Sequence, residues 1–187
     1  MRAVFAAFIA ALLLAAVAAP PSASAQSTEI EQAILAAPGN AGAEATVIRL
    51  NDDGSSTVIR EGSNGMMCWD SSEHPYNNWD SQCTSMENRA RVEQNHEFSM
   101  AGGTEEEIEA RFEEAERNGT RATSEYGSFY FHVVGDAPET ARPHTTVAVP
   151  GATGESMGGI PTSRRPAGLW LMQAGTSSAH LMMPGGM

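Results

Sequence analysis

Short stretches of alternating apolar and polar residues run along much of the chain, and this pattern predicts β-strands. Two runs rich in β-branched residues, 46–50 and 56–60, flank an Asp-Gly pair, and a third run, 66–69, follows an Asn-Gly pair. Both pairs readily take the positive φ angles of tight hairpin turns. The pattern therefore predicts a three-stranded antiparallel β-meander.

Two stretches in the middle of the chain repeat their apolar residues at helical spacing. The first, residues 83–98, is only moderately periodic. The second, residues 104–119, starts with a capping box of Thr104 and Glu107 and ends at Gly119, a residue type that favours the left-handed end of a helix. Glutamates in its first turn interact favourably with the helix dipole, so they need no acidic binding site to explain them.

Apolar runs return towards the C-terminus and predict four more strands, at 128–134, 144–149, 168–173 and 179–183. Strands, then helices, then strands again, without regular alternation, are typical of an α+β fold. We therefore expect a mostly antiparallel sheet with an N-terminal β-meander, two central helices and C-terminal strands.

The first 25 residues have the organisation of a secretory signal peptide. Arg2 precedes an apolar run, residues 3–19, which is followed by two prolines and an Ala-Ser-Ala stretch ending at Ala25. An uncleaved anchor is the alternative, but the run is short for a membrane span and no cysteine follows it directly for lipid attachment. We expect cleavage before Gln26, no stable membrane anchor after processing, and an exported, soluble protein, periplasmic or extracellular.

The expected organisation has three parts. Residues 1–25 are the signal peptide, residues 26–44 are a short helix and linker, and residues 45–187 form a single α+β domain. Within that domain, residues 150–167 are rich in Gly, Pro and Ser, which predicts a flexible loop.

The composition is strongly acidic, with 23 Asp and Glu against 11 basic residues, all of them arginine, and a net charge of -12. Such a chain repels phosphate backbones and anionic membranes, so we expect no nucleic-acid partner. Solubility is sufficient to explain the charge, and attraction to cations is the other interpretation.

The two cysteines, Cys68 and Cys83, are expected to form a disulfide because the chain is predicted to be exported. A metal-binding pair is the alternative, but the spacing is too long for a C-x-x-C site. The polar segment between them predicts a loop that carries Trp69, Tyr76 and Trp79. These aromatic residues could bind a ligand or fold back onto the core.

The sequence GESMGG, residues 154–159, matches the G-x-S-x-G pattern of serine hydrolases, with Ser156 as the nucleophile. That motif requires a strand entering directly, a helix leaving directly, and an acid and a histidine downstream. Here Gly159 and Pro161 disfavour a helix after Ser156, and no Asp or Glu follows Ser156 anywhere in the sequence. We therefore interpret the match as accidental.

The histidines are the remaining candidates for chemistry: His74, His96, His132, His144 and His180. His144 and His180 open predicted strands, so we expect both at one rim of the sheet, lining one pocket, with Met182 as a third group. Imidazole and thioether ligands suit soft metals, Cu(I) above all. General acid–base catalysis with Asp136 or Glu139 is the other role. His132, in mid-strand, is expected to be buried structurally or to face the helices.

Three stretches of the chain also resemble a family of uncharacterised exported bacterial proteins. They are an R-E-G-x-N-G-x-x-C stretch at 60–68, a Pro-His pair ending at His144, and an A-G-T-x-x-A-H-L-M stretch at 174–182. GESMGG is not part of this pattern. The resemblance implies export but no catalytic residue, because the family has no established activity.

We therefore expect an exported protein without catalytic activity that binds a small ligand, a metal or another envelope protein, or has a structural role. The alternative is a metal-binding protein or an enzyme that uses His144 and His180. The sequence requires no cofactor.

Overall fold

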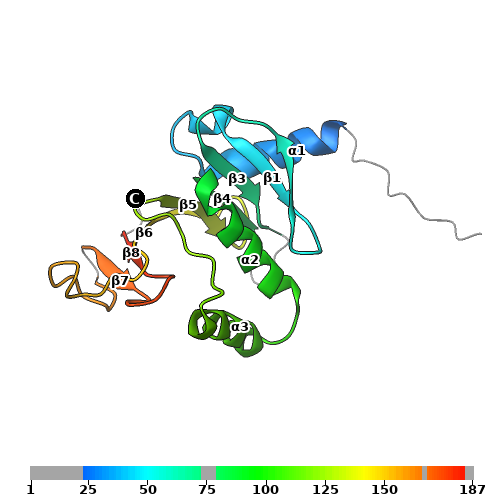
Figure 1. Cartoon of the computed structure of the whole chain (residues 1–187). Coiled ribbons are helices and arrows are strands. Elements are labelled where there is room, and N and C mark those ends of the chain that lie inside the picture. Colours follow the sequence, from blue (N-terminus) through cyan, green and yellow to red (C-terminus); the bar gives the residue numbers. More distant parts are fainter. Residues whose placement is uncertain (1–22, 73–78, 166–167, 184–187) are drawn as a thin grey trace, which may run out of the picture.

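One eight-stranded sheet, in the order β2-β1-β3-β4-β5-β6-β8-β7, forms the centre of the molecule (Figure 1). The computed structural model describes residues 23–72, 79–165 and 168–183. The strands are β1 (Thr46–Leu50), β2 (Ser56–Arg60), β3 (Met66–Asp70), β4 (Trp79–Ser85), β5 (Phe129–Gly135), β6 (Arg142–Ala148), β7 (Trp170–Met172) and β8 (His180–Met182). The helices are α1 (Ala23–Ala33), α2 (Arg89–Met100) and α3 (Glu105–Asn118), with the 3-10 turns η1 (Ile34–Ala36), η2 (Ala41–Glu44) and η3 (Met86–Asn88).

The predicted class, α+β with a mostly antiparallel sheet, is confirmed, but the predicted meander is wrong at its third strand. β1 and β2 form the expected antiparallel hairpin, whereas β3 pairs in parallel with β1. Burial explains the order: β3 carries apolar residues that are buried on both faces of the sheet, while the polar β2 is only partly buried and suits an edge. The connection between β2 and β3 must therefore cross the start of β1, and it does so at Gly62, whose amide donates to the Thr46 hydroxyl (3.1 Å).

The segment between the cysteines is not simply a loop, because β4 begins at Trp79 and pairs antiparallel with β3. Cys68 and Cys83 are directly opposite each other in this pair, and the predicted disulfide is confirmed. The polar composition of β4 made this strand hard to predict, because polar residues are usually exposed. Ser81 is fully buried because its hydroxyl donates to the Ala33 carbonyl (2.9 Å) and accepts from the Ala36 amide (3.1 Å).

The three aromatic residues predicted in that loop have different places. Trp69 belongs to β3 and is buried in the core, and Trp79 is half-buried at the start of β4. Tyr76 and His74 are outside the described residues.

The two faces of the sheet have different covers (Figure 1). On one face, η1 and the segment after it pack Ala36 and Ala45 against the disulfide, so part of the predicted linker contributes to the core. On the other face, α2 packs Val92 against Ile48, Met67 and Trp69. The predicted cleavage site before Gln26 lies within α1, and the rest of the predicted signal peptide, residues 1–22, lies outside the described residues.

Both central helices are confirmed, although α2 begins later than its predicted start at residue 83 because β4 occupies those residues. α3 has the predicted capping box between Thr104 and Glu107 and ends at Gly119 with φ 74°. It packs against α2, where the rings of Phe98 and Phe112 meet edge to face with centroids 5.3 Å apart.

The C-terminal strands are close to their predicted positions and extend the sheet beyond β5. The following turns, 150–165, place Met157 and Ile160 against Val149 and Leu171; the flexibility of this loop stays a prediction. Across the described ranges, no helix is long and apolar enough to span a membrane.

Candidate functional site

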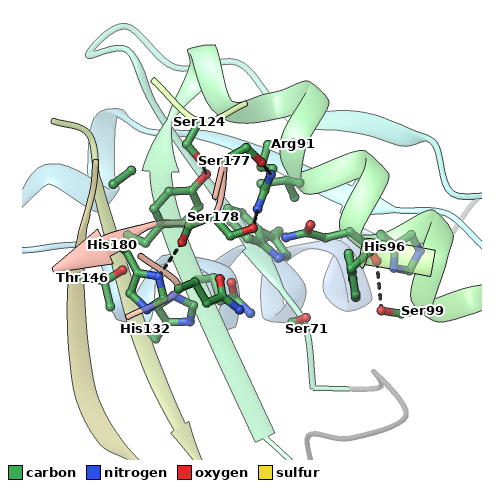
Figure 2. A pocket seen from close by; sticks show the side chains of 18 of the residues that line it. Ser71, Arg91, His96, Ser99, Ser124, His132, Thr146, Ser177, Ser178 and His180 are labelled. Atoms are coloured by element: carbon green, nitrogen blue, oxygen red, sulfur yellow. Dashed lines mark hydrogen bonds between the residues drawn. The ribbon is translucent and has the colours of Figure 1, made fainter. Parts of the chain in front are cut away.

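A cavity of about 450 Å³ lies between the sheet and α2, and part of its wall comes from the β7–β8 connection (Figure 2). Four of the five histidines line it, together with one buried arginine and several hydroxyl groups. Apolar side chains complete the wall, among them Leu50, Trp69, Val92 and Phe112. Most of the lining residues are polar. A cavity in which polar groups converge beside apolar side chains can bind a small molecule.

Strand register brings three of the histidines together. His132 on β5 is directly opposite His144 on β6, and their ring centroids are 5.9 Å apart. His180 on β8 is opposite Ala148, which lies on the same face of β6 as His144 because four residues separate them. His144 and His180 therefore line one cavity, and His132 lines it too, on the face that α2 covers. Met182 is not among the lining residues.

Burial disfavours the charged form of His132 and His144. Burial, together with the nearby His144 and His180, lowers the pKa of His132 from 6.5 to about 4. Burial and His180 also lower the pKa of His144. Asp80 on β4 shifts in the opposite direction, since burial raises its pKa to about 6, and its carboxylate lies 4.0 Å from Nδ1 of His132.

We predict that His132 and Asp80 oppose each other in the pH dependence of stability. As pH falls from about 6.5 to 4, the unfolded chain protonates His132 before the folded chain does, which costs up to about 3 kcal/mol of unfolding free energy. Over nearly the same range the folded chain protonates Asp80 first, which offsets much of that loss. Urea denaturation across this range should show a steeper acid loss of stability in Asp80→Asn than in the wild type, and a shallower one in His132→Gln. Parallel curves for the three proteins would contradict the prediction.

Hydrogen bonds determine the tautomers of His180 and His96. His180 donates from Nδ1 to the Ser178 carbonyl (2.8 Å), so Nε2 of the neutral ring carries a lone pair. His96 on α2 donates from Nε2 to the Asn51 carbonyl (2.7 Å), and its buried Nδ1 has no partner among the described residues. The rings of His132 and His144 make no hydrogen bond within the described part of the chain.

Arg91 of α2 also lines the cavity and is only 6% exposed. Its guanidinium donates to the Ala122 carbonyl (2.6 Å), to the Ser177 hydroxyl (3.0 Å) and to the Ser178 hydroxyl (Figure 2). Glu116 of α3 accepts from the same two hydroxyls. The neutral Ser177 and Ser178 therefore separate the arginine from the carboxylate.

Sequence reasoning missed Arg91, although α2 carries a signal for it. Asn88, Arg91, Asn95 and Ser99 recur at helical spacing, and three of these four polar residues are buried. A helix that turns a polar stripe towards a sheet needs partners for that stripe, which favours a polar cavity over a packed core.

The β7–β8 connection contributes a strained residue to the site. Gln173 lines the cavity and has φ 51°, the one positive value at a non-glycine residue in the described chain. A left-handed conformation costs an L-residue roughly 1–2 kcal/mol. Strained backbone conformations of this kind are found often at functional sites, where the function of the side chain compensates for the lost stability.

We expect Gln173→Gly to be more stable than Gln173→Ala by roughly 1 kcal/mol, because glycine takes the left-handed conformation without a steric penalty while alanine keeps it. Both variants lose the amide, so the comparison isolates the backbone. Urea denaturation of the two proteins measures the difference. An alanine variant at least as stable as the glycine variant would refute the strain.

Ser156 lies in an exposed turn, away from this cavity. Its hydroxyl donates to the Thr153 carbonyl (3.1 Å) and accepts from the Thr153 amide (2.9 Å). β6 ends at Ala148 and turns follow on both sides of Ser156, so the strand–turn–helix context of a hydrolase is absent from this described stretch.

The described residues contain no group of three His, Cys, Asp or Glu side chains arranged to hold a metal ion. Fold and cavity together define an α+β domain with an internal polar site on the helix-covered face of an open sheet. Comparisons with protein families, curated proteins and solved structures find no match to this chain.

Proposed function

We propose that this is an exported protein that binds a small molecule, without converting it, in the cavity between α2 and the sheet. The observation that carries the proposal is the cavity itself, about 450 Å³ in volume and lined by four histidines and a buried arginine. That volume lies within the range of known small-molecule sites.

Unsatisfied polar groups support binding over a purely structural role. A histidine kept for the fold alone would be expected to bond to the backbone, as His96 and His180 each do through one nitrogen. His132 and His144 have no such bond among the described residues, although both face the cavity. Nδ1 of His96, which also lines the cavity, is buried and has no partner among the described residues. A buried polar atom without a partner costs stability, and a bound ligand would recover that cost.

Export is supported by the disulfide, because disulfides persist mainly in oxidising compartments. N-terminal sequencing of secreted material should begin at Gln26. Recovery of a chain that starts at Met1 in the membrane fraction would contradict export as a processed protein.

Binding can be tested with prodan, an uncharged fluorophore whose emission shifts to the blue in apolar surroundings. Ala148→Phe places a ring inside the cavity, and Thr145→Phe places the same ring on the opposite face of β6. We expect the wild type and Thr145→Phe to bind prodan, and Ala148→Phe to bind it at least tenfold more weakly. Ala148→Leu is the milder substitution if the phenylalanine variant does not fold. Absence of binding in the wild type, or equal binding in all variants, would refute the proposal.

Catalysis by His144 and His180 is the second candidate, and the tautomer of His180 favours it. Donation from Nδ1 to the Ser178 carbonyl orients the ring and leaves Nε2 as a base on a residue that lines the cavity. Mass spectrometry of compounds recovered after incubation separates the two functions. A binding protein returns its ligand unchanged, whereas an enzyme returns a product, and that product should disappear in His180→Gln.

A further inference from the structure

The charge of Arg91 has no carboxylate partner in the described structure. The ion pairs among the described residues all involve other side chains. No described Asp or Glu oxygen therefore lies within 4.0 Å of the Arg91 guanidinium. Its three acceptors, one carbonyl and two hydroxyls, are all neutral. A buried cation with only neutral partners is costly, so a counter-ion at this position would be strongly favoured.

The Arg91 guanidinium also has N–H groups that donate to no acceptor in the described structure. Of its five N–H groups, three have acceptors, two on Nη1 and one on Nη2. The N–H of Nε and one N–H of Nη2 remain. Two parallel N–H groups of an arginine match the two oxygens of a carboxylate, which is the strongest geometry for such a pair.

The surrounding charges favour an anion, but only a weakly charged one. Arg121, a second buried arginine, adds positive charge near Arg91, and each lowers the pKa of Glu116. Burial opposes the ionisation of Glu116, yet the Ser177 hydrogen bonds and the two arginines outweigh that effect, so its carboxylate stays charged. Glu116 interacts with both arginines, whereas Glu109 interacts with Arg121 alone. The charge at Arg91 therefore leaves room for a monoanion, while a phosphate dianion would meet the repulsion of Glu116.

We propose that the Arg91 end of the cavity binds the carboxylate of a small organic acid whose apolar body packs among Leu50, Trp69, Val92 and Phe112. This inference rests on the proposed function of the cavity and adds the chemical class of its ligand. Arg91 holds the carboxylate from Nε and Nη2. Ser177 and Ser178 hold the arginine in that orientation, and the histidines that line the cavity bond to polar groups of the acid.

Displacement of prodan from the wild-type protein at pH 7.5 tests the inference with three compounds of nearly the same shape: naphthoate, naphthamide and naphthyl phosphate. We expect naphthoate to displace prodan at a concentration at least tenfold below that of naphthamide, and naphthyl phosphate to compete more weakly than naphthoate. Equal displacement by the acid and the amide, or no displacement by either, would overturn the inference while prodan binding still stands. Tighter binding of the phosphate would overturn the assignment to a carboxylate.

Variants locate the effect. Arg91→Gln should lose the preference for naphthoate over naphthamide, measured as the ratio of their displacing concentrations, and Arg91→Lys should restore part of that preference. Arg89→Gln, on the same helix but paired with Glu93, is the matched control and should behave as the wild type does. If Arg91 only supports the fold, its replacement will weaken prodan and naphthoate binding by the same factor. The comparison of acid with amide in the wild type decides the ligand class even if Arg91→Gln does not fold.

Discussion

Replacing Cys68 and Cys83 together by alanine is expected to lower the free energy of unfolding by about 2–5 kcal/mol. The bridge spans 15 residues of sequence, and closing a loop of that size restricts the unfolded chain by roughly 3 kcal/mol. Both residues are also completely buried beneath η1, so their loss removes packing as well.

Urea denaturation without reductant measures this effect. Paired serine substitutions should cost more than the alanine pair, because they bring hydroxyls into an apolar cluster. Thiol titration of the denatured, unreduced wild type is the control and should find no free thiol. Two reactive thiols in that material, or an alanine pair as stable as the wild type, would contradict the prediction.

The second large effect is expected at Gly62, where Gly62→Ala should cost about 3 kcal/mol or more, or prevent folding. The chain crosses the start of β1 at this point, and the amide of Ser63 donates to the Glu44 carbonyl (2.8 Å). A methyl group on residue 62 would collide with backbone atoms of Thr46, Ala45 and Glu44, none of which can move without displacing β1. The cost therefore comes from the crossing that lets β3 pair with β1.

Gly65→Ala is the matched control for Gly62→Ala. Gly65 has φ 73°, but a methyl group there would have no neighbour within 4 Å, so only the left-handed conformation is penalised. We expect a loss of roughly 1–2 kcal/mol. Circular dichroism during urea denaturation compares the two variants. A Gly62→Ala protein no less stable than Gly65→Ala would mean that the β2–β3 connection does not run as described.

Local signals were enough for most of the fold. The capping box at Thr104 and the hairpin between β1 and β2 depend on residues close in sequence, and both are confirmed. The position of β3 could not be predicted in the same way. Its pairing with β1 depends on how much apolar surface each strand buries, which involves the whole sheet. β4 was missed for a related reason, because its buried polar residues find partners in distant segments.

In the candidate site, too, some features could be predicted from local sequence and others depend on contacts between distant segments. Histidines stand out in any sequence, so His144 and His180 could be named as candidates, but their distance from His132 depends on the register of β5, β6 and β8. Arg91 was missed because an arginine on a helix is usually exposed, although the polar stripe of α2 favours a polar cavity. Its burial comes from Ser177 and Ser178, which lie more than 80 residues away in sequence.

By itself, the sequence determined the α+β class and most of the elements, because turn residues, capping and hydrophobic periodicity act over a few neighbouring positions. It also determined the partner of each cysteine, because the chain has only two. Only the tertiary structure decided the strand order and the cavity. Both depend on contacts between segments far apart in the chain, and such contacts leave no local pattern. The charge around Arg91 is the clearest case: the chain as a whole is strongly acidic, yet folding brings two buried arginines, Arg91 and Arg121, close to each other.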